Sequence, residues 1–297
     1  MGRVVVVGSL NVDRPWRVAR HAVVGETIEG RPLAPLPGGK GLNQAVAARR
    51  MGGDVALVGC VGADADGRWL LDVARGEGIG VDDVQVAADE ATGTALIVID
   101  DAGANTVTVA PGANRSLAIG TLLVERHDVV VAQLEVPAVA VADAFDQARR
   151  AGARTVLNPS PVEGAGRLVG AADVLVANEV EVAALVGTGV ADVLADPAGA
   201  ARRVGREGQA VVVTLGAQGV VAVGPDGEHH LAGLPATAVD TTGAGDCFLG
   251  VLAAALAEGL LVGSALERAN RAASIAVARL GTVPAMPTRA ELDAPPR

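Results

Sequence analysis

The sequence has 297 residues, of which 50% are hydrophobic and 20% charged, and its 24 basic and 34 acidic residues give a net charge of −10. This length is sufficient for one large α/β domain or two small ones. The acidic balance argues against nucleic acid as a partner, because phosphate backbones attract basic surfaces. No apolar run reaches the roughly 18 residues of a membrane span, and the first residues lack a signal-peptide pattern. We therefore expect a cytoplasmic protein that does not bind a membrane.

The first third of the chain predicts strands and helices in alternation, interrupted by two segments rich in short strands. The apolar, β-branched run at 4–7 predicts a buried strand, and the proline- and glycine-containing segment 11–37 predicts short strands rather than a helix. The further elements expected here are a helix from 40 to 51, a strand at 54–60, a helix at 65–75, and a hairpin of strands 94–99 and 106–109.

The rest of the chain alternates more regularly. The expected elements are strands at 128–133, 154–157, 173–177 and 210–215, helices at 138–150, from 179, at 197–207, 244–258 and 262–279, and a hairpin of strands 219–223 and 228–231. Such alternation predicts a mostly parallel sheet that is covered by helices on both faces. The hairpin-rich pieces do not fit into that sheet. We therefore expect an α/β domain formed by residues 1–10, 37–89 and 113–297, and a small β lid formed by 11–36 and 90–112.

The segment DTTGAGD at 240–246 stands directly before an apolar helix. Small residues allow the backbone to close around a ligand, and the free N–H groups of a helix N-terminus attract phosphate or an oxyanion. Asp246 would lie in the first helical turn, where it could accept a proton from a substrate hydroxyl that attacks phosphorus. A glycine turn followed by a first-turn acidic residue is the structural alternative.

Two further segments suit a polyhydroxylated ligand. GGKGLNQA at 38–45 combines glycines with amide side chains and contains the only lysine beside 23 arginines, although a plain helix N-terminus also fits. GSLNVD at 8–13 ends a strand, and Asn11 and Asp13 project on the same side of an extended chain. They could hold two hydroxyls, or Asn11 could form an Asx turn.

Two segments near the middle of the chain also follow predicted strands. In NEVE at 178–181, Asn178 and Glu181 share a helical face and could hold magnesium through water, or they could form a capping box. TLGAQG at 214–219 lies at a strand end, where α/β folds bind ligands, but it also fits a hairpin entry. The sequence leaves both alternatives open at both segments.

Taken together and in this order, these segments resemble the ribokinase (PfkB-type carbohydrate kinase) family, from Val4 to about Pro287. The resemblance implies a three-layer α/β/α fold with a small β-sheet lid, and ATP with magnesium as the phosphoryl donor. It implies that Asp246 is the base that activates a sugar hydroxyl, and that Gly243, Ala244 and Gly245 form an anion hole. The implied sugar ligands are Asn11, Asp13, Gly39, Lys40, Gly41, Asn43, Glu135 and Asp246.

The resemblance also implies residues for the nucleotide and for cations. Asn178 and Glu181 match positions around magnesium and phosphate. The nucleotide is expected to contact Asn178, Glu181, Thr214, Gly216, Gly219, Gly245 and Asn270. A monovalent cation such as potassium would lie near Asp240, Thr242, Ala276, Arg279 and Gly281. Ala285 stands where the family has a serine hydroxyl as a further ligand of that cation.

Within the family, the resemblance is nearest to the ribokinases, which implies that D-ribose is converted to D-ribose 5-phosphate. Another kinase of the family, acting on fructose, 2-keto-3-deoxygluconate or a nucleoside, is the main alternative. A non-catalytic sugar-binding regulator is the remaining one. The chain has only four aromatic residues for stacking on a nucleoside base: Trp16, Trp69, Phe145 and Phe248. Because small isolated sheets are marginally stable, we also expect two lids to pair in a homodimer.

Overall fold

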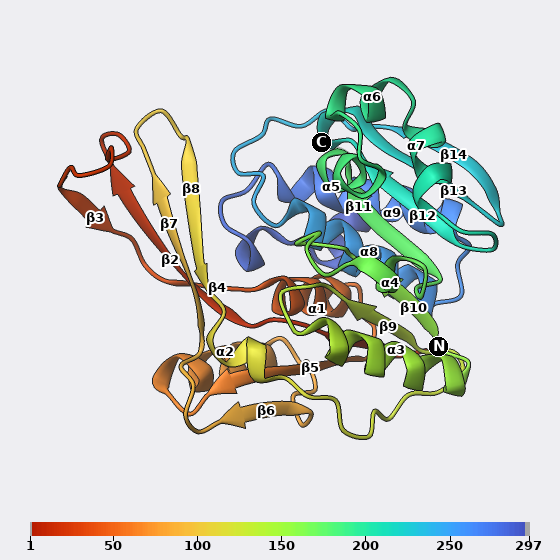
Figure 1. The fold of residues 1–297 in the computed structure, drawn as a ribbon, viewed down its shortest axis with the longest axis horizontal. Coiled ribbons are helices and arrows are strands. Elements are labelled where there is room, and N and C mark those ends of the chain that lie inside the picture. The colour runs from red at the N-terminus through yellow and green to blue at the C-terminus, as the bar shows by residue number, and fades with distance from the viewer. Residues whose placement is uncertain (1, 295–297) are drawn as a thin grey trace.

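The computed structural model describes residues 2–294 and contains one large sheet between helices and one small sheet that projects from it (Figure 1). The large sheet has nine strands in the order β14-β13-β12-β11-β10-β9-β1-β5-β6. Its strands from β6 to β12 pair in parallel, while β13 and β14 add an antiparallel edge. The strands are β1 (Val4–Val7), β5 (Val55–Gly62), β6 (Val84–Ala87), β9 (Val129–Ala132), β10 (Arg154–Leu157), β11 (Val174–Asn178), β12 (Ala210–Thr214), β13 (Gly219–Gly224) and β14 (Gly227–Ala232).

The central strands are buried on both faces, which explains their unbroken runs of valine. In β1, Val4 and Val6 belong to a core cluster with side chains of α1, α8 and α9. Val5 and Val7 belong to a second cluster on the other face with side chains of α3, α5 and α7. The helices are α1 (Lys40–Arg50), α2 (Ala65–Gly76), α3 (Ala138–Ala151), α4 (Gly166–Val169), α5 (Glu179–Val186), α6 (Val190–Ala195), α7 (Pro197–Val204), α8 (Ala244–Ala257), α9 (Val262–Ala276) and α10 (Arg289–Asp293).

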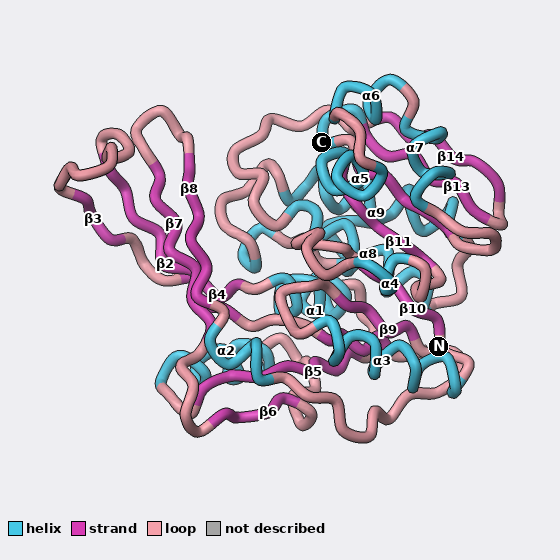
Figure 2. Tube along the Cα trace, viewed as in Figure 1, coloured by secondary structure: helices cyan, strands magenta, loops and turns pink. Residues whose placement is uncertain are grey.

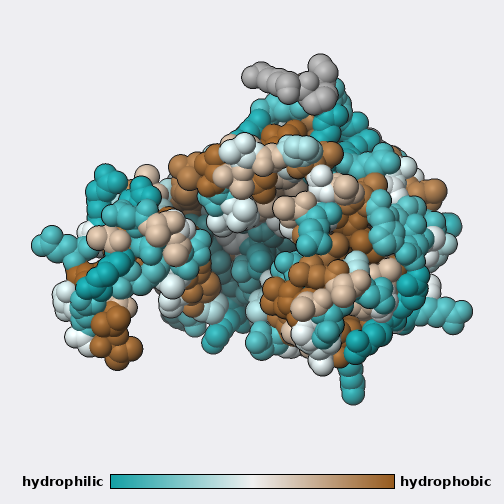
Figure 3. Space-filling model, turned by 90° about the horizontal axis from the view of Figure 1, so that it is seen from above, coloured by the Kyte–Doolittle hydropathy of each residue, from teal (hydrophilic) through white to brown (hydrophobic). Residues whose placement is uncertain are grey.

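The small sheet, which we call the lid, consists of strands and loops that project from the body of the molecule (Figure 2). Its order is β3-β2-β7-β8, and β4 pairs with β2. Seen from above, the surface is hollowed between the lid and the body, and hydrophilic residues line the hollow (Figure 3). The lid strands are β2 (Asn11–Val18), β3 (Gly30–Pro32), β4 (Leu36–Gly38), β7 (Gly93–Ile99) and β8 (Asn105–Ala110).

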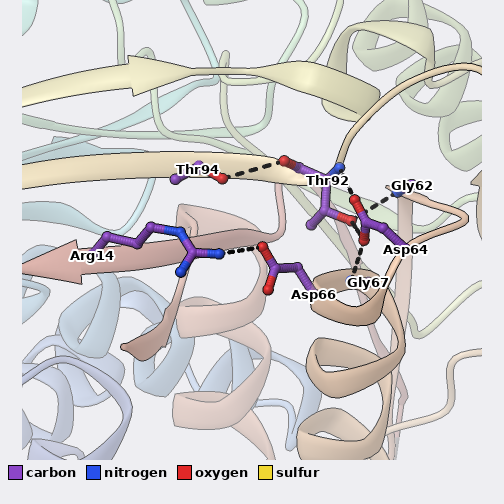
Figure 4. Close-up of polar contacts among 7 residues, drawn as sticks. All are labelled: Arg14, Gly62, Asp64, Asp66, Gly67, Thr92 and Thr94. Atoms are coloured by element: carbon purple, nitrogen blue, oxygen red, sulfur yellow. Dashed lines mark hydrogen bonds and ion pairs between the residues drawn. The ribbon is translucent and has the colours of Figure 1, made fainter. Parts of the chain in front are cut away.

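The lid is attached to the body at the start of α2 (Figure 4). Asp64 caps this helix by accepting from the N–H of Gly67 at 2.8 Å. The same carboxylate accepts from the N–H of Thr92 at 2.8 Å and from its hydroxyl at 2.6 Å, directly before β7. Arg14 of β2 also forms an ion pair with Asp66 of α2 at 2.5 Å. Both lid strands that leave the body are therefore tied to one helix N-terminus.

The elements predicted from the sequence are present, with bounds that differ by a few residues. The prediction missed β6, α4, α6 and α10, which have four to six residues each and therefore carry little periodicity. The lid sheet also extends to Gly38 through β4, because Asn11 pairs with Gly38. Over residues 2–294, no helix combines the length and apolar character that crossing a bilayer requires.

Candidate active site

Asp246 lies in the first turn of α8, at the end of the glycine-containing segment. The helix begins after Gly243, whose positive φ of 75° is accessible to glycine at little cost. Asp246 is 8% exposed, and each of its carboxylate oxygens accepts a hydrogen bond from an amide of α1. Asn43 Nδ2 donates to Oδ2 at 3.0 Å, and Gln44 Nε2 donates to Oδ1 at 2.8 Å. The contact between α1 and α8 thus fixes this carboxylate.

The N-terminus of α1 approaches the end of β1 very closely. Gly39 has a φ of 88°, and a Cβ at Gly41 would lie 2.6 Å from the backbone nitrogen of Ser9. The hydroxyl of Ser9 and the N–H of Lys40 both donate to Glu135 Oε2, the latter at 3.2 Å. The two glycines therefore allow Lys40 and Glu135 to meet beside Asp246.

Lys40 places a positive charge among these carboxylates. Its burial lowers the pKa of the ammonium group, but the neighbouring charges of Asp246, Glu135 and Glu181 oppose that effect, and the net result is a pKa above the usual value. Lys40 is therefore charged at neutral pH. A fixed positive charge in this position suits a ligand that carries negative charge.

Asn11 and Asp13 lie at the start of β2, and both are buried. Asn114 Nδ2 donates to Asn11 Oδ1 at 2.8 Å. Burial raises the pKa of Asp13 to about 7, with further contributions from the charges of Glu135 and Asp246. Asp13, Glu135 and Asp246 thus form one acidic cluster, next to the end of the lid that joins the body.

A cleft of about 200 Å³ opens in front of Asp246, at the carboxyl ends of β11 and β12. Parallel α/β sheets bind ligands at this edge. The cleft brings together predicted residues from four segments that are distant in sequence. Its lining is Lys40, Asn158, Val176, Ala177, Asn178, Glu181, Thr214, Gly243, Gly245, Asp246 and Leu249.

The interior of the cleft contains the capping box that the sequence suggested as an alternative to a magnesium site. Asn178 Oδ1 accepts from the N–H groups of Val180 and Glu181, while Glu181 Oε2 accepts from the N–H of Asn178 at 3.0 Å. Asn158 Nδ2 donates to the same oxygen at 3.4 Å. Within the described part of the chain, no group of three or more His, Cys, Asp or Glu side chains is arranged to hold a metal ion directly. The capping role does not exclude the other one, because both side chains also face the cleft.

The residues expected around the nucleotide lie partly in this cleft. Thr214 pairs with Asn178 across β11 and β12, so both strands end at the same level. The loop after Thr214 contains two glycines with positive φ, Gly216 at 55° and Gly219 at 102°. Asn270 of α9 lies away from the cleft lining and donates to the carbonyl oxygen of Ala232 at 2.9 Å. It therefore contacts the end of β14 rather than Asp246.

The residues expected around a monovalent cation meet at the end of α9. Asp240 accepts from the N–H of Thr242 at 2.9 Å and from the N–H of Gly281 at 3.0 Å, which joins these two loops. The guanidinium of Arg279 is directed to Glu291, at 2.6 Å, so only its backbone is available to the loop. Ala276 and Ala285 are both buried. Backbone carbonyls are thus the only oxygen ligands that Ala276 and Ala285 can offer.

Two glutamines and three other polar residues near the site were not selected from the sequence. They are Gln44, Gln133, Ser9, Asn114 and Asn158. Gln44 stands inside the glycine-rich segment, directly after Asn43, and this adjacency was the available signal. Ser9 likewise stands inside the segment GSLNVD at 8–13, two positions before Asn11. Gln133, Asn114 and Asn158 lie outside the segments selected from local patterns.

A second and larger cavity, of about 560 Å³, lies at the opposite edge of the sheet. Its lining includes Asp128, Arg154 and Asp173, which stand at or before the amino ends of β9, β10 and β11. It contains none of the predicted site residues. Because ligands of parallel α/β sheets bind at the carboxyl ends of the strands, the smaller cleft is the better candidate for the active site.

The sequence is related to known carbohydrate kinases over its whole length. The profile of the pfkB family of carbohydrate kinases matches residues 1–289. The chain is 33% identical over 299 residues to the ribokinase of Bacillus subtilis, with 99% of each protein covered. It is 33% identical over 292 residues to the ribokinase of Haemophilus influenzae, with 96% of this chain and 95% of that protein covered. It is also 36% identical over 299 residues to a bifunctional ribokinase/ribose-5-phosphate isomerase A of Fructilactobacillus sanfranciscensis, with 97% of this chain covered but only 55% of that protein.

Solved structures show the same fold. The ribokinase of Thermotoga maritima superposes with a TM-score of 0.85 at 30% identity, covering 99% of this chain and 98% of that one. The ribokinase of Arabidopsis thaliana, in complex with ribose and ATP, superposes with a TM-score of 0.83 at 29% identity, covering 98% of both. The large, mostly parallel sheet and the small lid sheet are common to these proteins, which confirms the predicted fold class. This chain belongs to the pfkB family of carbohydrate kinases.

Proposed function

We propose that the protein transfers the terminal phosphoryl group of ATP to a hydroxyl of D-ribose and forms D-ribose 5-phosphate. The observation that carries this proposal is the Asp246 carboxylate, which lies at a helix N-terminus beside Lys40 in the cleft at the strand ends. The similarity to the ribokinases of Haemophilus influenzae and Bacillus subtilis supports ribose, and the ribose and ATP bound by the Arabidopsis thaliana enzyme support both substrates.

In the proposed reaction, Asp246 accepts the proton of the attacking sugar hydroxyl. A bond forms between that oxygen and the terminal phosphorus, and the bond from this phosphorus to the oxygen of the departing ADP breaks. Gly243, Ala244 and Gly245 would hold the transferred group with backbone N–H groups and the positive end of α8. Apart from the neighbouring residues of its own helix, no heavy atom of the described chain lies within 4 Å of a Cβ built on Gly245, so this turn is open, which supports its proposed role.

The acidic cluster is the proposed sugar site. Asn11, Asp13 and Glu135 would bind hydroxyl groups, together with Asn43 and the backbone of the segment from Gly39 to Gly41. Carboxylates and amides suit a sugar, because each can accept hydrogen bonds from hydroxyl groups. This arrangement would place the sugar between the lid and Asp246.

The nucleotide and its cations would occupy the rest of the cleft. Thr214, Gly216, Gly219 and Asn270 are proposed to contact the nucleotide. Asn178 and Glu181 fit magnesium held through water, since Glu181 supplies a carboxylate in the cleft. Magnesium would neutralise phosphate charge when bound. For potassium, the proposed ligands are backbone carbonyls near Asp240, Thr242, Ala276, Arg279 and Gly281. Ala285 has no side-chain hydroxyl and would not contribute a side-chain ligand.

We also propose the division into an α/β domain of residues 1–10, 37–89 and 113–297 and a lid of 11–36 and 90–112. The lid is supported by its separate sheet.

We further propose that two chains pair through their lids in a homodimer, and that the protein acts in the cytoplasm, where ATP is available. The two buried free cysteines, Cys60 and Cys247, are compatible with a reducing compartment.

The Asp246→Asn variant tests the catalytic role. We expect kcat to fall by about 10²- to 10⁴-fold, because the amide cannot accept the proton, while ribose binding measured by calorimetry is retained. Turnover at the rate of the original protein would contradict the proposal.

A substrate panel tests the sugar. ADP release would be measured with ribose, fructose, 2-keto-3-deoxygluconate, adenosine and pseudouridine, with and without potassium. We expect the largest kcat/KM with ribose, and NMR of the product should place the phosphate on the 5-oxygen. A higher value with another acceptor would reassign the substrate within the family. Ribose binding without any ADP release would indicate a sugar-binding regulator.

A further inference from the structure

Two buried glutamines form a hydrogen-bonded chain behind Asp246. Gln44 and Gln133 are both 0% exposed, and neither lines the cleft. Gln133 Nε2 donates to Gln44 Oε1 at 2.7 Å, and Gln44 Nε2 donates to Asp246 Oδ1 at 2.8 Å. We infer that Gln44 and Gln133 are positioning residues that orient the Asp246 carboxylate for phosphoryl transfer. This inference rests on the proposed role of Asp246 as the base.

The direction of the chain follows from the chemistry of its groups. An ionised carboxylate only accepts hydrogen bonds, so the amide nitrogen of Gln44 must face Asp246. The oxygen of Gln44 then faces Gln133, and only the nitrogen of Gln133 can donate to it. Each amide therefore has one allowed orientation. A carboxylate that receives a fixed donor on one oxygen and Asn43 on the other has no freedom to rotate.

The backbone makes room for this chain at two glycines. A Cβ at Gly8, directly after β1, would lie 2.1 Å from Gln133 Oε1. A Cβ at Gly250 of α8 would lie 2.4 Å from the backbone oxygen of Gln44. Larger residues at either position would displace the glutamines. The close packing thus holds both side chains in one arrangement, as a positioning role requires.

The amide side chains around Asp246 are not completely paired with other protein groups. Within residues 2–294, Asn43 Oδ1 and Gln133 Oε1 are buried and have no hydrogen-bond partner. Leaving a buried acceptor unpaired costs stability, whereas apolar side chains of the same shape would not carry this cost. The donors of Asn43 and Gln44 face Asp246, and the donor of Gln133 faces Gln44.

If Gln44 acts through Asp246, its loss should reduce turnover more than sugar binding. Gln44→Met preserves the length of the side chain but removes the donor to Oδ1. We expect kcat with ribose and saturating ATP to fall by about ten- to a hundredfold, with KM for ribose changing by less than about threefold, because small errors in orientation impair the chemical step. Gln133→Met should give a smaller loss of kcat, since Gln44 then keeps its own bond to Asp246.

A second variant gives a pH profile that a purely structural role of Gln44 would not change. In Gln44→Glu, the carboxyl group can replace the lost donor only when it is protonated. We therefore expect its kcat, relative to that of the original protein, to rise as the pH falls from 8 to 6. Gln44→Met should show no such rise. If the Met variant does not fold, the pH profile of the Glu variant still decides.

Gln209 offers a matched control. It is buried at the other end of the sheet, where its Nε2 donates to the carbonyl oxygens of Val169 and Ala172. Gln209→Met should lower the melting temperature without lowering kcat. Equal kcat losses in the Gln209 and Gln44 variants, or an unchanged kcat in Gln44→Met, would overturn the inference. If the glutamine inference fails but Asp246→Asn abolishes turnover in the same assay, the proposed function still stands. If Asp246→Asn is fully active, the proposed function and the glutamine inference both fail.

Discussion

At the scale of single residues, Asp13 is a buried carboxyl group whose surroundings disfavour its charge. Burial raises its pKa to about 7, and the charges of Glu135 and Asp246 add to this effect. The folded protein therefore binds a proton on Asp13 at pH values where the unfolded chain, with a pKa near 3.8, has lost it. The stability that this proton contributes is complete below about pH 4 and is lost as the pH rises to about 7. The loss is on the order of 4 kcal/mol.

The Asp13→Asn variant tests this argument. An amide stays neutral at every pH, so the variant should gain stability relative to the original protein between pH 5 and pH 8. Melting temperatures of the ligand-free proteins would be measured across this range. Asp143→Asn, on the exposed face of α3, provides the control and should follow the original protein. A difference between Asp13→Asn and the original protein that does not change with pH would contradict the raised pKa.

The residue scale also shows what the sequence could predict about the site. Lys40, Asn178, Glu181, Thr214 and Asp246 were selected from local patterns, and the structure brings them into one cleft. Local patterns suffice for them because each lies at the end of a predicted strand or at the start of a predicted helix. Gln133 could not be found in this way, since its partner Gln44 is 89 positions distant. The pKa of Asp13 was equally inaccessible, because it depends on burial and on two distant carboxylates.

At the scale of elements, the contact between α1 and α8 decides the geometry of the site. Gly250 lies one turn after Asp246, and a Cβ there would lie 2.4 Å from the backbone oxygen of Gln44 and 2.6 Å from Ala47 Cβ. Gly250→Ala should therefore separate the two helices and weaken the bonds from Asn43 and Gln44 to Asp246. We expect a loss of about 1–3 kcal/mol in unfolding free energy from overpacking, together with a lower kcat.

Gly76 is the control for this prediction. It ends α2, and apart from the neighbouring residues of that helix no heavy atom of the described chain lies within 4 Å of a Cβ built on it. Gly76→Ala should leave kcat unchanged and should stabilise the protein by up to about 1 kcal/mol. Urea unfolding and steady-state kinetics of both variants would make the comparison. Full activity and stability in Gly250→Ala would show that the helices can adjust without consequence.

Elements were predictable in proportion to their length and periodicity. The apolar strands and the long helices α3, α8 and α9 carry enough repeats to be recognised from sequence. The pairing order of the strands was not predictable, because it depends on contacts between distant segments. For example, β1 pairs with β9 as well as with β5, although β9 comes much later in the chain. The family resemblance implied the three-layer fold with its lid, but the order of the strands comes from the structure.

At the scale of the whole molecule, the lid has more exposed apolar surface than an isolated sheet should carry. All six residues of its edge strand β8 are exposed, and Val107 and Val109 lie opposite Ile97 and Ala95 of β7 on one face. Exposed edge strands and apolar sheet faces favour association with another chain. Polar contacts that hold the lid to the body include those of Thr92 with Asp64 and Gly62 and of Arg14 with Asp66 (Figure 4). A second lid would cover this surface and stiffen it.

The Val107→Lys variant tests the proposed homodimer. Val107 is 54% exposed, so lysine is tolerated in a single chain, but its charge would be buried at an interface between lids. Light scattering at micromolar concentration should give twice the 29.5 kDa of one chain for the original protein and a single-chain mass for the variant. The monomeric variant should also have a higher KM for ribose, because a less rigid lid closes the sugar site less well.

Val139→Lys, at a 66% exposed position of α3, is the control and should remain dimeric and active. A single-chain mass for the original protein would contradict the proposed homodimer and would show that the lid sheet is stable in a single chain.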